Sequence, residues 1–196
     1  MTDGFAALLG EIRGCTACAG LPLGPKPVVR GSSAVRLLIV SQAPGTAAHA
    51  SGLTFDDASG DRLRDWLAID RATFYDAARI AIMPMGFCYP GRLPKGGDRP
   101  PRRECAPLWH GRLRAELPQV RLTLLVGSYA IRACLPGTGR QSMTETVRGW
   151  RGHLPDCIPM PHPSWRTTGW QRNNAWFETE LLPELRQRVT DVLAAD

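Results

Sequence analysis

The sequence predicts an α/β fold: a single three-layer α/β/α domain, residues 1–196, around a short, mostly parallel four-stranded sheet. Short apolar runs bounded by turn residues alternate along the chain with segments whose apolar residues recur at helical spacing. This alternation is typical of parallel sheets with helices on both faces. The chain length suits one core of full size, and no internal repeat is visible.

Four apolar runs are the expected strands. The first contains Leu37-Leu38-Ile39-Val40, a continuous apolar stretch of the kind found in strands that are covered on both faces. The second has alternating and adjacent Ile, Ala and Met residues, and the fourth is short. We place the four strands at residues 35–41, 79–85, 122–126 and around Ile158.

The expected helices lie between and beside these runs. Ser59-Gly60-Asp61 can cap a helix that carries apolar residues on one face. Other helices are expected at residues 5–13, 103–117, 128–134 and 175–193, whereas residues 144–150 are ambiguous. Three stretches are expected to be irregular: residues 21–33, the loop that leads from the first strand to Ala58, and the basic Pro/Gly-rich residues 91–103.

Charge and hydropathy narrow the functional classes. The net charge is +6, supplied almost entirely by arginine, which favours a polyanionic partner such as nucleic acid. A solvated, arginine-rich surface is the alternative interpretation. We expect no membrane association and a cytoplasmic location, because no stretch is long and apolar enough to span a bilayer and the amino terminus lacks a signal-peptide pattern.

Polar turns follow the first and the last expected strand. Ser41-Gln42-Ala43-Pro44-Gly45 comes directly after the first strand, and Pro161-His162-Pro163-Ser164 follows the fourth. Ligands of open parallel sheets bind at the carboxyl ends of the strands. The two turns should therefore line one crevice, with a histidine opposite a loop of small residues.

The six cysteines should stay reduced in a cytoplasmic protein, so disulfides are disfavoured. Cys15-x-x-Cys18, together with the distant Cys88 and Cys105, suits four-thiolate ligation of an iron–sulfur cluster or of zinc. The alternative is that the Cys-x-x-Cys spacing is coincidental and the other thiols are small core residues. Cys134 and Cys157 lie in apolar contexts and are expected in the core.

Four features taken together resemble the uracil-DNA glycosylase superfamily, and most closely its iron–sulfur branch. The segment from Glu11 to Cys18 is similar to the Cys-x-x-Cys of that branch, and Cys88 and Cys105 fall at nearly its intervals. The turn at residues 41–45 resembles the first active-site motif, and His162-Pro163-Ser164 resembles the second. The order and the spacing of these features make the resemblance specific.

The resemblance implies a monomeric, monofunctional DNA glycosylase that hydrolyses the N-glycosidic bond of a flipped-out uracil, or of a related deaminated base, during base excision repair. It implies a [4Fe-4S] cluster on Cys15, Cys18, Cys88 and Cys105, with zinc as the alternative. The catalytic residues it implies are His162, which stabilises the departing base anion, Asp57, the best match to a water-activating carboxylate, and Gln42. It places the base against Gln42, Ala43, Pro44, Gly45, Phe55, Met85 and Gly86, and DNA against Ser164, Trp165 and Arg166.

Two departures from the family pattern bear on the substrate. Ala43 stands where some superfamily members carry a carboxylate, and Pro84-Met85-Gly86 stands where an asparagine usually reads uracil. The asparagines of this chain are Asn173 and Asn174. We therefore expect weaker discrimination among deaminated bases than uracil-only enzymes show.

Two alternative functions stay open, and the first of them follows from the missing asparagine. One is a glycosylase for hypoxanthine or xanthine, and the other is a non-catalytic nucleic-acid-binding protein with a structural four-cysteine site. The basic residues of the irregular loop can grip phosphates in any of these proteins, or can be merely solvated. They are Arg92, Lys95, Arg99, Arg102 and Arg103.

Overall fold

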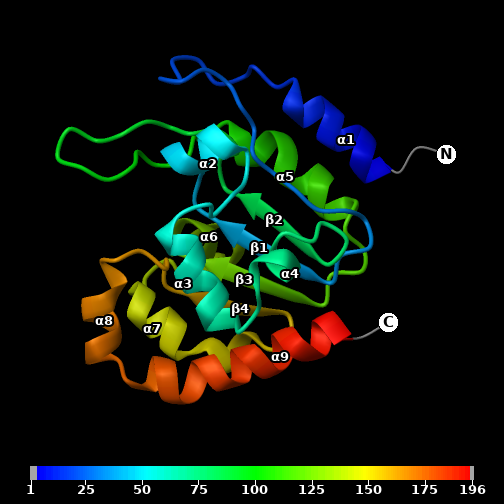
Figure 1. The fold of residues 1–196 in the computed structure, drawn as a ribbon. Helices are drawn as coiled ribbons and strands as arrows, with labels where there is room; N and C mark the ends of the chain where they lie inside the picture. Colours follow the sequence, from blue (N-terminus) through cyan, green and yellow to red (C-terminus); the bar gives the residue numbers. More distant parts are fainter. Residues whose placement is uncertain (1–3, 195–196) are drawn as a thin grey trace.

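The computed structural model describes residues 4–194 and contains one sheet of four parallel strands within that range. The strands are β1 (Leu37–Ser41), β2 (Ile80–Pro84), β3 (Leu122–Val126) and β4 (Cys157–Met160). Their order across the sheet is β2-β1-β3-β4, with Ile39 paired to Ile82 on one side and to Leu124 on the other. The predicted fold class is confirmed, and the sheet is parallel throughout (Figure 1).

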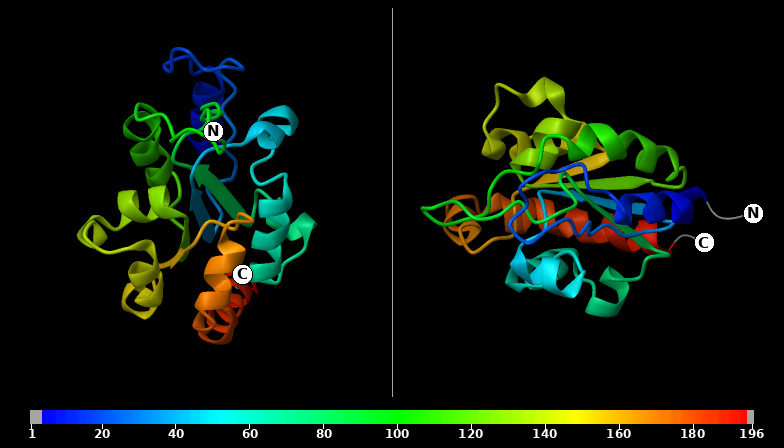
Figure 2. Two further views of the ribbon diagram at one scale, coloured as in Figure 1. Left: turned by 90° about the vertical axis from the view of Figure 1, so that its left-hand side faces the viewer. Right: turned by 90° about the horizontal axis from the view of Figure 1, so that it is seen from above.

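Helices cover both faces of the sheet. The helices are α1 (Gly4–Arg13), α2 (Thr46–Ser51), α3 (Ala58–Leu67), α4 (Arg71–Phe74), α5 (Cys105–Ala115), α6 (Ser128–Cys134), α7 (Met143–Arg148), α8 (Thr167–Asn173) and α9 (Leu182–Ala194). Short 3₁₀ turns span Pro136–Thr138 and Trp150–His153. Figure 2 shows α5, α6 and α7 on one side of the sheet and α2, α3 and α4 on the other, where α3 also packs against α9.

The core sits between these layers. All five residues of β1, β2 and β3 are buried, as expected for strands that carry helices on both faces. Each fully buried Leu or Ile contributes about 1.5–3 kcal/mol relative to an exposed side chain, so the central strands are a rigid base for the loops that follow them. No helix within residues 4–194 has the length and apolar character needed to cross a membrane.

Several predicted boundaries are wrong for identifiable reasons. The first strand begins at Leu37 rather than at residue 35, because the Val35 amide closes a turn onto the Ser32 carbonyl. The expected loop after β1 contains α2, which is too short to show helical periodicity and ends at Gly52 in the left-handed conformation. Helix α8 was also not predicted, and it follows the second active-site turn.

The capping of α3 also differs from the prediction. Asp57, not Ser59-Gly60-Asp61, caps the helix, because its backbone is extended and its Oδ1 accepts a hydrogen bond from the Gly60 amide. Asp61 lies in the first turn and pairs with Arg64.

The carboxyl-terminal helix is interrupted where one continuous helix at 175–193 was expected. Residues Phe177–Leu181 form a π-helical turn, and α9 begins only at Leu182. Pro183 explains the interruption, because it has no N–H to donate to the preceding turn and its ring crowds that turn's carbonyls.

Candidate active site

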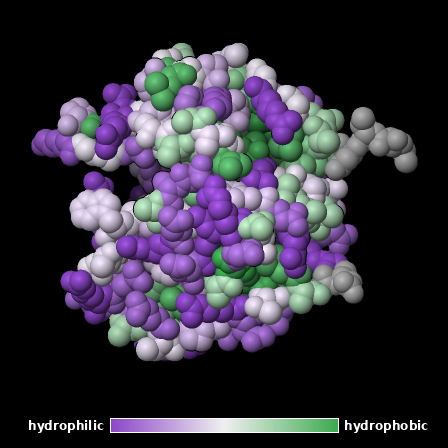
Figure 3. Space-filling model, in the orientation of Figure 1, coloured by the Kyte–Doolittle hydropathy of each residue, from purple (hydrophilic) through white to green (hydrophobic). Residues whose placement is uncertain are grey.

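A cleft of about 690 Å³ lies at the carboxyl ends of the strands. The chain leaves β1 toward β2 on one side and returns to β3 on the other, so β1 and β3 flank the switch point where parallel sheets bind ligands. Figure 3 shows a hollow on the left-hand side at this end of the molecule. The lining includes Gln42, Ala43, Pro44, Gly45, Phe55, Asp57, Pro84, Asp98, His162, Ser164, Trp165 and Arg166.

The first active-site turn is tied to the segment after β2. The Met85 amide donates to the Ser41 carbonyl at 2.8 Å, and the Gly86 amide donates to the Gln42 carbonyl at 3.1 Å. These bonds extend the sheet pairing beyond the strands and hold the turn at the cleft floor. Gly45 is then the N-cap of α2, whose first residues, Thr46, Ala47 and Ala48, also line the cleft.

His162 lies at the end of β4 and packs against the backbone that leaves β3. Gly127 has a φ of +89°, and a Cβ at this position would lie 3.3 Å from the His162 Cβ. The His162 carbonyl accepts hydrogen bonds from the Thr167 hydroxyl and the Ser164 amide, which close the turn behind the ring. Because Gly127 has no side chain, His162 can pack directly against the backbone at this position.

The environment of His162 favours a neutral ring. Burial lowers the pKa of His162 below its ordinary value, although the negative charge of Asp57 opposes this shift. A neutral imidazole still carries one N–H donor, so His162 can donate a hydrogen bond without being protonated.

Phe55 is held beside His162. The two ring centroids are 6.3 Å apart, and the ring planes are inclined by 34°. The backbone of Phe55 is in the left-handed region, with a φ of +59°, and its carbonyl accepts a hydrogen bond from the Tyr75 hydroxyl at 3.0 Å. Gly60 completes the arrangement, because a Cβ there would lie 1.7 Å from the Phe55 oxygen.

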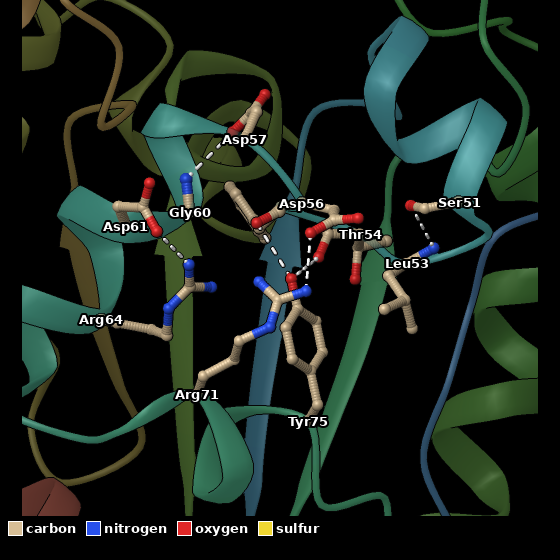
Figure 4. Close-up of polar contacts among 11 residues, drawn as sticks. Ser51, Leu53, Thr54, Asp56, Asp57, Gly60, Asp61, Arg64, Arg71 and Tyr75 are labelled. Atoms are coloured by element: carbon tan, nitrogen blue, oxygen red, sulfur yellow. Dashed lines mark hydrogen bonds and ion pairs between the residues drawn. The ribbon is translucent and has the colours of Figure 1, made fainter.

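Two adjacent carboxylates near Phe55 have different partners (Figure 4). Asp56 pairs with Arg71 at 2.8 Å, and the hydrogen bonds from Arg71 and Ser51 lower the pKa of Asp56. Asp57 lines the cleft, and within residues 4–194 only its Oδ1 is engaged, by the Gly60 amide at 3.0 Å. Asp57 therefore keeps an oxygen available in the cleft, whereas Asp56 is committed to an ion pair.

Met85 and Gly86 are not among the described residues that line this cleft. Met85 is partly buried against the core, and a Cβ on Gly86 would lie 3.2 Å from the Arg102 amide. Pro84 is the residue of this segment that reaches the cleft. The role of Met85 and Gly86 here is to hold the first turn, and their contact with a base stays a prediction.

Residues 91–99 form a hairpin that the sequence analysis expected only as an irregular loop. Arg92 and Asp98 form an antiparallel bridge, and the Leu93 amide donates to the Gly97 carbonyl at 2.9 Å. Gly96 and Gly97 both have positive φ. The Gly-Gly pair is a hairpin-turn signal in the sequence that could have revealed the hairpin. In Figure 1 this hairpin projects from the molecule on the same side as α8. Among its residues, Arg92, Leu93, Gly96, Gly97 and Asp98 line the cleft.

The mouth of the cleft has an exposed apolar side chain on each lip. Trp165 is 76% exposed on the 162–166 turn, and Leu93 is 44% exposed on the hairpin. Arg62 donates to the Ser164 carbonyl at 2.7 Å and so anchors the turn that carries Trp165. The Arg166 guanidinium lies over the Trp165 ring and approaches Gly97, so the two lips meet at this point.

Some basic side chains of residues 91–103 are held by protein partners, whereas others are exposed. Arg102 donates to the Ala19 carbonyl and lies 3.8 Å from Glu104, so it holds the amino-terminal segment. Arg99 donates to the Arg92 carbonyl at 3.2 Å within the hairpin. The side chains of Arg92, Lys95 and Arg103 are exposed.

The cysteines of the predicted metal site line one small apolar cavity. Cys15, Cys18, Cys88 and Cys105 are all part of its lining. Burial raises the pKa of the Cys105 thiol to about 12 and also raises those of Cys18 and Cys88, with added contributions from neighbouring thiols. Cys134 and Cys157 lie elsewhere and pack against the core.

The donors that this cavity offers to a metal or a cluster are four thiols. Four thiols without other ligands are the donors that an iron–sulfur cluster uses. In residues 4–194, no three His, Cys, Asp or Glu side chains stand close enough together to share one metal ion. Metal ligation itself stays a prediction.

Comparison with known proteins identifies the family. A sequence model of the Uracil DNA glycosylase superfamily matches residues 29–186, and the chain belongs to this superfamily. The matched range contains both cleft turns but begins after Cys15 and Cys18, so the iron–sulfur branch stays a prediction. Membership supports a glycosylase-type hydrolase with DNA as its partner.

The chain is also similar to a solved structure. It is a solution NMR structure of a protein from Methanosarcina acetivorans described as a "putative Uracil DNA glycosylase". The two proteins are 15% identical, the alignment covers 81% of this chain and 93% of that chain, and the TM-score is 0.46.

Proposed function

We propose that this protein is a monofunctional DNA glycosylase that hydrolyses the N-glycosidic bond of a flipped-out uracil or related deaminated base. The observation that carries the proposal is that His162 and the turn at residues 41–45 line the same cleft. Phe55, 6.3 Å from the histidine ring, gives the same cleft an aromatic face. Together these groups suit a planar base whose carbonyl oxygen must be stabilised as the bond breaks.

The reaction follows from this arrangement. The bond between the base and C1′ of the sugar breaks, and the base leaves with the bonding electrons as an anion. His162 donates its N–H to the base oxygen on which this charge gathers, which is electrostatic stabilisation of the transition state. The oxygen of a water molecule forms a new bond to C1′, and the proton it loses balances the charge on the base. The products are the free base and an abasic site.

Asp57 and Phe55 support this chemistry in different ways. Asp57 keeps one oxygen free of its capping bond, and this oxygen would orient the attacking water. Phe55 would stack on the base, an interaction worth about 1–3 kcal/mol for any planar base. Gln42 and the backbone of the first turn would supply hydrogen bonds to the base edge.

The mouth of the cleft would bind the DNA. A base can enter the cleft only if it leaves the base stack, and an apolar wedge can take its place in the duplex. Trp165 is the most exposed large apolar side chain of the described residues and lies at this mouth. Ser164 and Arg166 flank it and would contact the phosphates.

The four-cysteine cavity would hold a [4Fe-4S] cluster, with zinc as the alternative. The thiolates of Cys15, Cys18, Cys88 and Cys105 would bind it. When bound, the cluster would supply four metal–thiolate bonds that join the amino-terminal segment to the segment after β2 and to the first residue of α5. Because this ligation needs reduced thiols, we infer that the enzyme works in the cytoplasm. We also propose that it acts as a monomer.

Metal analysis and a cysteine variant test the cluster. Freshly purified protein should be yellow-brown with broad visible absorbance, and Cys88→Ala should lose the colour and much of the solubility. Cys134→Ala is the matched control, because this thiol lies outside the cavity, and it should keep the colour. Colourless protein with stoichiometric zinc would contradict the iron assignment, and protein without metal would contradict both.

Deaminated purines are a second candidate class of substrate, because neither asparagine of the chain is among the described residues that line the cleft. The Asn174 side chain donates to the Trp170 carbonyl and accepts from the Trp176 indole, and Asn173 ends α8. The base must then be read by groups such as Gln42, which favours hypoxanthine and xanthine as additional substrates.

Excision assays test the proposed function. Oligonucleotides with one uracil, hypoxanthine or xanthine each are incubated with the protein, and the released base and the abasic site are measured. Release of at least one of these bases is the expected result. Binding of all the oligonucleotides without release would instead indicate the non-catalytic nucleic-acid-binding protein.

A further inference from the structure

The hairpin at residues 91–99 brings a carboxylate into the cleft that the proposed mechanism does not use. Asp98 lines the cleft together with Gln42, Gly45 and His162. Its position is fixed by the hairpin backbone, since Asp98 bridges to Arg92 and the next amide, that of Arg99, donates to the Gly91 carbonyl at 2.8 Å. Asp98 is thus held in the cleft by the main chain rather than by its side chain.

Gly45 leaves the space into which this carboxylate reaches. A Cβ on Gly45 would lie 3.7 Å from Oδ2 of Asp98, which is ordinary contact distance for a methyl group. Any larger side chain at position 45 would compete with Asp98 for the same volume. The last residue of the first active-site turn therefore opens the cleft toward the hairpin.

The carboxylate of Asp98 has no hydrogen bond or ion pair to another side chain or amide in the described part of the chain. The other two carboxylates of this region each have a partner: Asp56 pairs with Arg71, and one of the two oxygens of Asp57 accepts from the Gly60 amide. A carboxyl group that lines a cleft without a partner is available to a ligand. Asp98 differs from its neighbours in this respect.

We propose that Asp98 contacts the base edge and is a specificity-determining residue of the glycosylase. This inference rests on the proposed function and extends it. Uracil, hypoxanthine and xanthine share an edge on which a carbonyl stands next to a ring N–H. A protonated carboxyl group donates to the carbonyl and accepts from the N–H, as a carboxamide does, whereas an ionised carboxylate only accepts. Asp98 would thereby take the part of the asparagine that is absent after β2.

The groups around Asp98 act on its ionisation in opposite directions. Partial burial raises its pKa above the ordinary value, Asp57 at the start of α3 raises it further, and Arg92 on the hairpin opposes the shift. The Arg166 guanidinium approaches the neighbouring Gly97 from the other lip. A bound base would exclude water and favour the protonated form further. Excision should therefore weaken as the pH rises through the pKa of Asp98.

Two variants of Asp98 separate this role from a structural one. Asp98→Ala removes both polar atoms and should slow single-turnover excision of every accepted base by about tenfold or more. Asp98→Asn keeps the donor and the acceptor at every pH, so it should retain excision at low pH and lose the decline that the wild type shows as the pH rises. Asp65→Asn is the control, since this exposed carboxylate on α3 lies outside the cleft and the substitution removes the same charge.

The measurements are excision rates at pH 5 to 8 on uracil, hypoxanthine and xanthine oligonucleotides, with His162 intact in all variants. Wild-type activity with a slow Asp98→Ala and a flattened profile for Asp98→Asn supports the proposal. Wild-type rates in Asp98→Ala, or an unchanged pH profile in Asp98→Asn, would overturn it while leaving the glycosylase function standing. Absence of excision by the wild type on all three substrates would overturn both.

Discussion

The floor of the cleft follows buried parallel strands, whereas its outer lip, the hairpin at residues 91–99, is held by backbone bonds within the hairpin. His162 and the turn at residues 41–45 belong to the floor, where neighbouring backbone leaves little room for movement. Leu93 and Asp98 belong to the lip, most of whose residues are exposed. We infer from this difference that the rigid floor performs the chemistry and holds the base, whereas the exposed lip grips the DNA and adds a further contact to the base.

Gly127→Ala is the variant that should disturb the floor of the cleft most. The added Cβ would press on His162 from 3.3 Å, and the positive φ costs an L-residue about 1–2 kcal/mol. We expect kcat to fall about tenfold or more while DNA affinity changes little, because the histidine is displaced from the base oxygen. Steady-state kinetics and thermal denaturation measure the two effects.

Gly137→Ala is the matched control for Gly127→Ala, because a Cβ at position 137 meets nothing within 4 Å. It should leave both kcat and the melting temperature close to wild type. A Gly127→Ala enzyme with wild-type kcat would show that the floor is not rigid.

Gln42→Leu tests how the floor reads the base. The variant keeps the volume of the side chain but removes its amide, so excision of every accepted base should fall by about tenfold. The measurement is single-turnover excision on the same panel of oligonucleotides. A loss restricted to uracil, or a wild-type enzyme that excises uracil alone, would refute the expected permissive reading.

Trp165→Ala tests the lips and should have the smallest effect. Loss of an exposed wedge should weaken duplex binding by about three- to tenfold, with little change in excision from single-stranded DNA, where no base stack has to be opened. Leu23→Ala is the control, since Leu23 is also exposed but does not line the cleft. Equal effects of the two substitutions on duplex affinity would contradict the assignment of Trp165 as a wedge.

The sequence predicted the floor better than the lip, for physical reasons. Leu37 to Val40 form a continuous apolar run because β1 is buried on both faces, and the turn that follows is therefore recognisable. Asp98 could not be assigned, because a hairpin of exposed residues has no hydrophobic periodicity. Its place in the cleft depends on its approach to Gly45, which lies far away in sequence.

The start of α3 at Asp57 shows a second reason why the sequence did not predict the whole site. The stretch Asp56-Asp57-Ala58-Ser59-Gly60-Asp61 offers several capping residues, and local sequence does not distinguish among them. The choice of Asp57 is made by the close approach of Gly60 to the Phe55 carbonyl, which fixes where the helix begins. This contact also positions Phe55 in the site.

The most direct test of the central claim is the excision rate and the DNA affinity of His162→Ala, measured on the base that the wild type releases fastest. Removing a hydrogen bond that strengthens in the transition state should cost about 2.7–4 kcal/mol, a loss of about a hundred- to a thousandfold in rate. Affinity for the same duplex should stay within about threefold, because the interaction contributes little to ground-state binding. His153→Ala, outside the cleft, should match the wild type in both. A His162→Ala enzyme that excises at the wild-type rate would contradict the account.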